Sequence, residues 1–266
     1  MPFTFGGVFS RFFKLIGENF GLFISLGLLL TVIPAIATNY AMLTLIGVTQ
    51  ETWVTKAHEF TTQSWLIGVG LSLGMGMLGL FNLAAVTEIA ILRSVGKKVK
   101  IGSVLAHALG NIIPVFAISL IVSLLTGLCL VLLIIPGIMY ALASCVAVPA
   151  YIGQPGLGLW GAVQKSYELT RGHRWTIFAL GFVGLIALAI IEGAITAPLT
   201  IGPMMQAIAQ GQDAAAEPGN LVYIMLNAAI NGIGSVLTQI FVVAVYVCLR
   251  QSKEKATPDT AASVFE

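Results

Sequence analysis

An amphipathic segment followed by long apolar stretches occurs three times along the chain. The amphipathic segments cover 3–18, 100–111 and a stretch that begins at 159. In each, apolar residues recur at three- and four-residue spacing with polar or basic residues between them, which is typical of a helix on a membrane surface. The apolar stretches that follow are long enough to cross a bilayer, which takes about 20 residues per helix. The pattern predicts an all-α, polytopic membrane bundle of three repeats, each a surface helix plus a helical hairpin.

The third repeat shows this most clearly in LWGAVQKSYELTRGHRWTIFAL, residues 159–180. The residues expected on its apolar face are Leu159, Trp160, Val163, Tyr167 and Thr170. Gly172 then stands where a helix C-cap is expected, and Trp175 opens an apolar run. Gly17 and Gly110 hold the corresponding positions in the other repeats. We expect all three glycines to be elbows with a left-handed or otherwise unusual backbone between surface helix and span.

The spans are predicted at about 21–43, 64–92, 112–152 (two spans), 175–197 and 221–249. Pro136-Gly137 divides the long run 112–152 into a hairpin, which gives six transmembrane helices. One integral membrane domain, 1–250, contains units of about 1–99, 100–156 and 157–250. The remaining 251–266 is expected to be a polar, disordered cytoplasmic tail.

Charge supports the hairpin at 112–152. With it, both termini are cytoplasmic, and twelve of the 13 basic residues lie inside while Lys56 lies outside. A single span there would divide them six against seven, which the positive-inside rule disfavours. The second arm is short, because sixteen residues at about 1.5 Å each reach about 24 Å against a core of about 30 Å. Whether 136–152 crosses the whole bilayer is left open.

Composition agrees with a membrane protein. The chain is 58% hydrophobic and 9% charged, whereas soluble domains carry about a quarter charged residues. Cys129, Cys145 and Cys248 are isolated in apolar stretches, and no metal site or cofactor is expected. The N-terminal run imitates a signal peptide, but the same pattern recurs twice downstream, so we interpret it as an uncleaved first span.

Several short motifs lie in 135–180: an Ile-Pro-Gly turn, a short span ending at Pro149, and the elbow SYELTRGHRW. In this combination the chain resembles the glycerophosphoryl diester phosphodiesterase membrane-domain family, including YciC-type bacterial inner-membrane proteins. The matching residues are Pro136, Gly137, Pro149, Ser166, Leu169, Thr170, Arg171, Gly172 and Trp175. The resemblance implies a multi-pass protein of the bacterial inner membrane. It does not imply phosphodiesterase activity, because six spans leave no room for the catalytic barrel.

Four polar residues of the expected spans are candidate functional residues: Glu88, Glu192, Asn227 and Asn231. Intramembrane acids are functional candidates because burying them is costly. The alternative is structural, namely an interfacial ion pair for Glu88 and a helix–helix hydrogen bond for Glu192. Asn227 and Asn231 begin a polar stripe that could line a path or bind helices together, and small residues four apart (Gly70/Gly74, Ser72/Gly76, Ala228/Gly232) favour close helix packing.

Basic and aromatic residues gather on the inner surface. The candidate binding residues for an anionic lipid are Arg171, Arg174, Lys165, Trp175, Arg11 and Lys14. Ordinary positive-inside anchoring is the competing interpretation. No catalytic cluster or nucleic-acid-binding motif is present, so we expect a non-enzymatic protein of membrane or envelope organisation whose partners are lipids, other membrane proteins or further copies of itself. The alternative is a transporter or export component for a lipid or small amphiphile.

Overall fold

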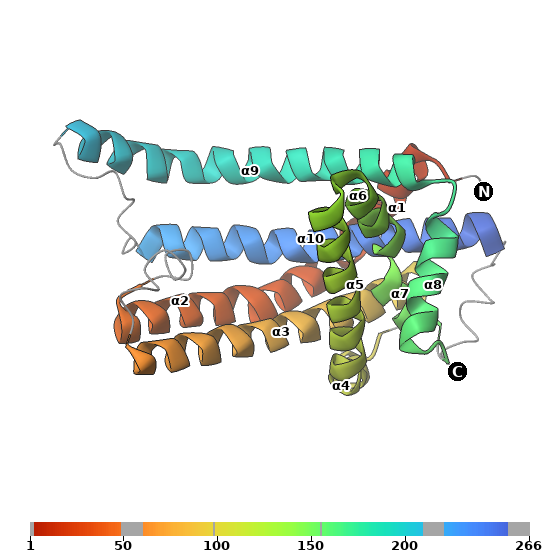
Figure 1. Cartoon of the computed structure of the whole chain (residues 1–266), viewed down its shortest axis with the longest axis horizontal. Helices are drawn as coiled ribbons and strands as arrows, with labels where there is room; N and C mark the ends of the chain where they lie inside the picture. Colours follow the sequence, from red (N-terminus) through yellow and green to blue (C-terminus); the bar gives the residue numbers. More distant parts are fainter. Residues whose placement is uncertain (1–2, 49–60, 98, 155, 210–220, 255–266) are drawn as a thin grey trace. The chain divides into compact units, whose positions relative to one another are not determined.

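The computed structural model describes residues 3–48, 61–97, 99–154, 156–209 and 221–254, and all regular structure in them is helical (Figure 1). The helices are α1 (Phe5–Gly27), a π-helical segment (Leu28–Val32), α2 (Ile33–Ile46), α3 (Thr62–Ser94), α4 (Ile101–Gly110), α5 (Ile112–Leu132), α6 (Ile134–Ser144), α7 (Ala147–Gly153), α8 (Leu159–Thr170), α9 (Arg174–Ala209) and α10 (Leu221–Glu254). Six helical stretches in this part of the chain are long and apolar enough to cross a membrane. The chain is therefore a multi-pass membrane protein.

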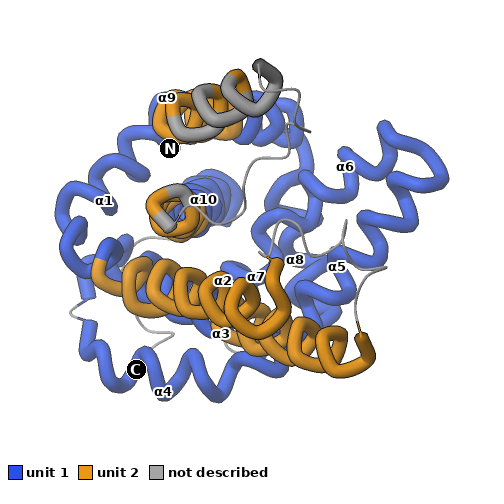
Figure 2. The backbone as a smooth tube through the Cα atoms, turned by 90° about the vertical axis from the view of Figure 1, so that its left-hand side faces the viewer, with its two compact units in different colours: residues 1–24, 80–183, 236–266 blue, residues 25–79, 184–235 orange. Residues whose placement is uncertain are grey.

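The chain forms two compact units (Figure 2). Unit 1 comprises 1–24, 80–183 and 236–266, and unit 2 comprises 25–79 and 184–235. Unit 1 contains all of α4 to α8, whereas unit 2 contains the π-helical segment, α2 and parts of α1, α3, α9 and α10. Every Lys and Arg of the sequence except Lys56 falls within the ranges of unit 1. The charge asymmetry seen in the sequence therefore coincides with a division of the fold.

The second half of α3 is at the centre of unit 1. Residues 84–92 are all buried, so every face of the helix is covered there. The matching part of α10 is also buried, including Ile240, Val243 and Tyr246. A second apolar cluster joins α5, α7 and α8 through Ile118, Ala147 and Val163. This cluster holds the surface helix α8 against the body of unit 1.

Small-residue packing is confirmed at one predicted position and not at others. In unit 2, a Cβ on Gly232 would lie 2.6 Å from Val32, so α10 approaches the π-helical segment closely because this residue is glycine. A Cβ on Gly70, Gly74 or Gly76 would meet nothing within 4 Å. The predicted packing stripe on α3 is therefore not a contact surface in the structure.

Of the three predicted elbows, the one at Gly172 is confirmed. Its φ is +88°, in the left-handed region, between the end of α8 and the start of α9. Near Gly17 the helix continues, and the non-helical residue is Asn19 (φ −132°, ψ 23°). Near Gly110 the break is at Asn111 (φ −93°, ψ 2°). The expectation of an unusual glycine backbone at Gly17 and Gly110 was wrong, because negative-φ asparagines make those two turns.

We therefore expect Gly172→Val to be damaging and Gly17→Ala to be tolerated. A side chain in the left-handed region costs about 1–2 kcal/mol, and no Cβ contact at Gly17 opposes alanine. Thermal unfolding in detergent measures the stability of both variants. Gly184→Val, where a Cβ would meet nothing within 4 Å, is the matched control for valine within a long helix. Equal melting temperatures for the Gly172 and Gly184 variants would contradict this assignment.

The predicted hairpin between 112 and 152 is present, but its turn is earlier than expected. The turn residue is Leu133, which is extended (φ −156°, ψ 124°), whereas Pro136 and Gly137 already belong to the first turn of α6. Proline is accommodated there because the first N–H groups of a helix have no partner within it. A Cβ on Gly137 would lie 2.6–2.7 Å from Leu130, so glycine lets the two arms of the hairpin meet.

The α5–α6 hairpin runs across the other helices of unit 1. In Figure 1 its arms are seen crossing in front of α10, and in Figure 2 α5 and α6 are seen from the side while α10 is seen along its axis. The hairpin of the middle predicted repeat thus runs in a different direction from the other helices of unit 1. The threefold repeat of equivalent units stays a prediction.

Candidate functional site

The buried face of α8 overlaps the expected one only in part, because Val163 and Thr170 are buried as predicted whereas other residues of the expected face are not. Its buried residues are Ala162, Val163, Ser166, Leu169 and Thr170. Trp160 and Tyr167, which were expected to pack on the apolar side, are 57% and 49% exposed. Ser166 and Thr170 face inward because both hydroxyls form hydrogen bonds with the Ala143 carbonyl oxygen of α6.

Those hydroxyls fasten α8 to α6. The Ser166 Oγ donates to the Ala143 carbonyl oxygen at 2.7 Å, and the Thr170 Oγ1 lies 3.4 Å from the same oxygen. Ala143 is near the end of α6, where backbone carbonyls lose their helical partners. The spacing of four residues between Ser166 and Thr170 brings both side chains to that carbonyl. The Ser-x-x-Leu-Thr part of the elbow motif is therefore a docking element.

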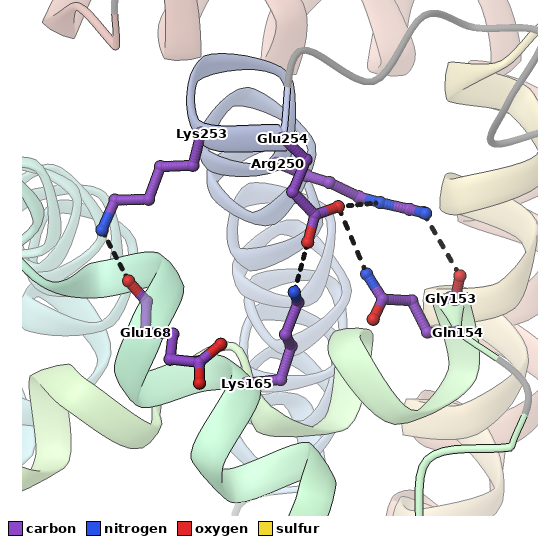
Figure 3. A network of polar contacts seen from close by, with 7 residues as sticks. All are labelled: Gly153, Gln154, Lys165, Glu168, Arg250, Lys253 and Glu254. Carbon is purple, nitrogen blue, oxygen red and sulfur yellow. Dashed lines mark hydrogen bonds and ion pairs between the residues drawn. The ribbon is translucent and has the colours of Figure 1, made fainter.

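The C-terminal end of α10 forms a polar network with α7 and α8 (Figure 3). The Glu254 carboxylate accepts from the Lys165 Nζ at 2.5 Å and from the Arg250 Nε at 2.9 Å. The Gln154 Nε2 lies 3.5 Å from the same carboxylate. Arg250 also donates to the Gly153 carbonyl at the end of α7. Lys165, a predicted lipid-binding residue, is thus already neutralised within the protein.

Lys253 caps the surface helix. Its Nζ donates to the carbonyl oxygens of Glu168 at 2.5 Å and of Arg171 at 2.6 Å, both at the C-terminus of α8. A cation at a helix C-terminus is favourable because the carbonyls there carry partial negative charge. In the sequence, Lys253 is one of the twelve basic residues expected on the inner side, with no specific role. In the structure it contacts the α8–α9 elbow.

Arg171 and Arg174 are basic residues of the elbow that make no ion pair within the described residues. Arg171 is exposed, and the Arg174 guanidinium lies over the Tyr167 ring, 4.2 Å from its centroid. The Nε and Nη2 atoms of Arg174 are buried and have no hydrogen-bond partner in that part of the chain. The Arg174 guanidinium beside Tyr167 lowers the pKa of its phenol. Trp175, the next residue, is 72% exposed.

Phe3 is the residue of the first amphipathic segment that contacts the elbow. Its ring lies 5.0 Å from the His173 ring. Lys14 is 72% exposed and 3.8 Å from Glu18, a surface pair that contributes little. Arg11 has a buried Nη1 without a partner among the described residues. No contact brings Arg11 or Lys14 to the elbow in that part of the chain, so the predicted single site separates into two regions.

The His173 imidazole predicts a pH dependence of stability. Burial and then the Lys253 charge lower the pKa of His173 below its ordinary value of 6.5. The folded state thus favours neutral imidazole, so stability is highest above pH 6.5 and falls as pH drops through that value, where the unfolded chain takes up the proton first. We expect the melting temperature to fall more between pH 8 and pH 5.5 in the wild type than in His173→Asn. An equal fall in both proteins would contradict the assignment.

The four intramembrane polar residues divide between the two units. In unit 1, the His107 Nδ1 is 3.0 and 3.1 Å from the two oxygens of Glu88, whose side chain is 7% exposed. This contact fits the interpretation of Glu88 as a member of an interfacial ion pair, with His107 of α4 as its partner. In unit 2, the Asn231 amide donates to the Asn227 side chain at 2.6 Å, and the Thr196 hydroxyl donates to the Glu192 carbonyl. Both contacts lie within a single helix, and the second involves the Glu192 backbone rather than its carboxylate. The helix–helix hydrogen bond of Glu192 and the role of the stripe therefore stay predictions.

Sequence reasoning did not anticipate the roles of His107, Gln154, Lys253 and Glu254. Apart from the Arg250–Glu254 pair within α10, their partners are 19 or more residues away, so no local motif signals the contacts. No group of three or more His, Cys, Asp or Glu residues that could hold a metal occurs among the described residues. Comparison with protein-family models, curated proteins and solved structures finds no match. The family resemblance drawn from the elbow motif therefore stays a prediction.

Proposed function

We propose that this multi-pass membrane protein is non-enzymatic and engages the cytoplasmic leaflet of the bacterial inner membrane, where it binds anionic lipid at the α8–α9 elbow. The elbow is defined here as residues 167–175. The supporting observation is the division of its cations. Lys165 and Lys253 are used within the protein, whereas Arg171 and Arg174 have no carboxylate partner in the described part of the chain.

The surroundings of the two arginines suit a lipid headgroup. Tyr167 lies against Arg174, Trp175 is the next residue, and both are exposed, as is Trp160 near the start of α8. Aromatic side chains of this kind prefer the membrane–water interface. Arg171 and Lys253 lie close enough for like-charge repulsion, which lowers the affinity of the site for further cations and favours an anion. A lipid phosphate would accept charge-assisted hydrogen bonds from the exposed Arg171 side chain.

The orientation follows from charge. The ranges of unit 1 hold every basic residue except Lys56, and basic residues favour the cytoplasmic side. Both termini then lie in the cytoplasm. The sequence predicts 45–63 and 198–220 to be periplasmic loops. Residues 49–60 and 210–220 lie outside the described residues, whereas 198–209 belong to α9, so the second loop begins later than predicted. Membrane or envelope organisation is the role that this arrangement supports.

Native mass spectrometry of the purified protein in a mixture of anionic and zwitterionic lipids tests the lipid site. We expect Arg171→Gln with Arg174→Gln to lower the occupancy of co-purified anionic lipid by about one to two orders of magnitude, since each basic residue near an anionic surface contributes about 1 kcal/mol. Zwitterionic lipid should be unchanged.

The matched control is Lys97→Gln with Lys100→Gln, which removes the same charge from the α3–α4 connection. Lys253 is unsuitable as a control, because its loss would also uncap α8. If the two double variants lose anionic lipid equally, the arginines act only as general anchors and there is no site at the elbow.

A further inference from the structure

The α5–α6 hairpin has an exposed apolar turn. From Leu130 to Ile135 the exposed fractions of six consecutive residues are 40%, 86%, 70%, 66%, 69% and 76%. The sequence holds no Asp, Glu, Lys or Arg between Lys100 and Lys165. The connections predicted to lie outside the membrane are different, because 45–63 contains Glu51 and Lys56 and 198–220 contains Asp213 and Glu217. A turn made only of apolar residues is suited to hydrocarbon rather than to water.

The backbone of this turn is compatible with hydrocarbon. The Leu133 N–H donates to the Cys129 carbonyl at 2.8 Å, and the Leu133 carbonyl accepts from Gly137 at 3.2 Å. Pro136 has no N–H to satisfy. The one extended residue of the turn thus has both polar groups bonded, as an apolar environment requires.

The direction and length of the hairpin argue against a crossing. In Figure 1 the arms of the hairpin run across the direction of α10, and in Figure 2, which looks along α10, α5 and α6 lie beside it and are seen from the side. α6 alone has 11 residues, about 16 Å at 1.5 Å per residue, against a hydrocarbon core of about 30 Å. The whole stretch Ile134–Gly153 has the length of a span, but it is interrupted between α6 and α7. Beyond α6 the chain bends and enters α7, which packs on the surface helix α8.

Both ends of the hairpin are fixed within unit 1. At its start, α4 is joined to α3 by the His107–Glu88 contact, and the His107 side chain is 59% exposed. At its end, the Ala143 carbonyl accepts the Ser166 hydroxyl of α8. A hairpin that stays on one side returns the chain to that side just as two crossings would. The positive-inside rule therefore fits both arrangements equally.

We propose that the α5–α6 hairpin does not cross the bilayer but lies within the acyl chains of the cytoplasmic leaflet. Together with α4 and α8, it then adds cross-sectional area to that leaflet alone, and the protein favours membranes that are convex on their cytoplasmic side. The occupant of the exposed apolar surface is lipid acyl chain. The inference rests on the proposed function for the sidedness of unit 1 and does not depend on the arginines of the elbow.

The depth of the turn is tested with Val131→Cys in a protein lacking the three native cysteines, which is treated with a membrane-impermeant maleimide from each side. We expect no labelling from either side. A fluorophore attached to this cysteine should be strongly quenched by lipids that carry quenchers on their acyl chains. Gln164→Cys should be labelled only from the cytoplasmic side. Labelling of the Val131→Cys variant from the periplasmic side shows a crossing hairpin and overturns the proposal. A disulfide between two copies of that variant, in place of lipid quenching, overturns it as well.

The preference for curvature is tested by reconstitution into vesicles of equal lipid composition and about 50 or 400 nm diameter, with unit 1 outward as verified by Gln164→Cys labelling. We expect at least a threefold higher protein density in the small vesicles. Val131→Lys with Ile135→Lys, which makes the turn polar, should abolish the difference while retaining anionic lipid in native mass spectrometry. Equal density of the wild type in both vesicle sizes overturns the proposal. If Arg171→Gln with Arg174→Gln loses anionic lipid but still prefers small vesicles, the lipid site at the elbow and the leaflet position of the hairpin are independent.

Discussion

Gly137→Val should be among the most destabilising single substitutions in unit 1. A Cβ at Gly137 would lie 2.6 Å from the Cγ and Cδ2 of Leu130 and 2.7 Å from its Cα. The side-chain atoms can rotate away, but the Cα is backbone, so the two arms of the hairpin must separate. Overpacking of this kind costs about 1–3 kcal/mol, and valine adds two methyl groups beyond the Cβ.

Thermal unfolding in detergent measures the effect of Gly137→Val. The matched control is Gly127→Val on α5, where a Cβ would meet nothing within 4 Å. Both substitutions add the same side chain to the same hairpin, so their difference isolates the contact with Leu130. If the control is destabilised as much, the close approach of α5 and α6 does not determine the stability of the hairpin.

Replacing Ser166 by Ala together with Thr170 by Val should release α8 from α6. Both residues are fully buried, and the two hydroxyls share the Ala143 carbonyl. Removing them leaves a buried carbonyl without its donors, which costs about 1–3 kcal/mol. We expect a lower melting temperature and faster proteolysis of the α7–α8 connection in mixed micelles.

Ser144→Ala is the control for this pair, because Ser144 is also buried but its hydroxyl donates to Tyr140 within α6 itself. Its loss should leave the docking of α8 intact. A control that accelerates proteolysis as much as the double variant would show that the bonds to Ala143 do not hold the surface helix.

The sequence determined the membrane class, the hairpin at 112–152 and the elbow at Gly172. These follow from hydrophobic periodicity, from the distribution of Lys and Arg, and from a glycine at the position where a helix C-cap was expected. Each is a local property or a sum over the chain, so it can be read without knowing which segments meet.

The tertiary structure decided which face of α8 is buried and which cations are available. Tyr167 and Trp160 are apolar enough for a buried face, but Ser166 is buried beside Thr170 because both hydroxyls bond to the Ala143 carbonyl. In the sequence, Lys165, Lys253 and Arg171 are all basic residues of the expected inner side. In the structure, Lys165 pairs with Glu254 and Lys253 binds carbonyls at the end of α8. The direction of α5 and α6 was also a tertiary property, because an apolar helix of 21 residues has the same composition whether it crosses a bilayer or lies within one leaflet.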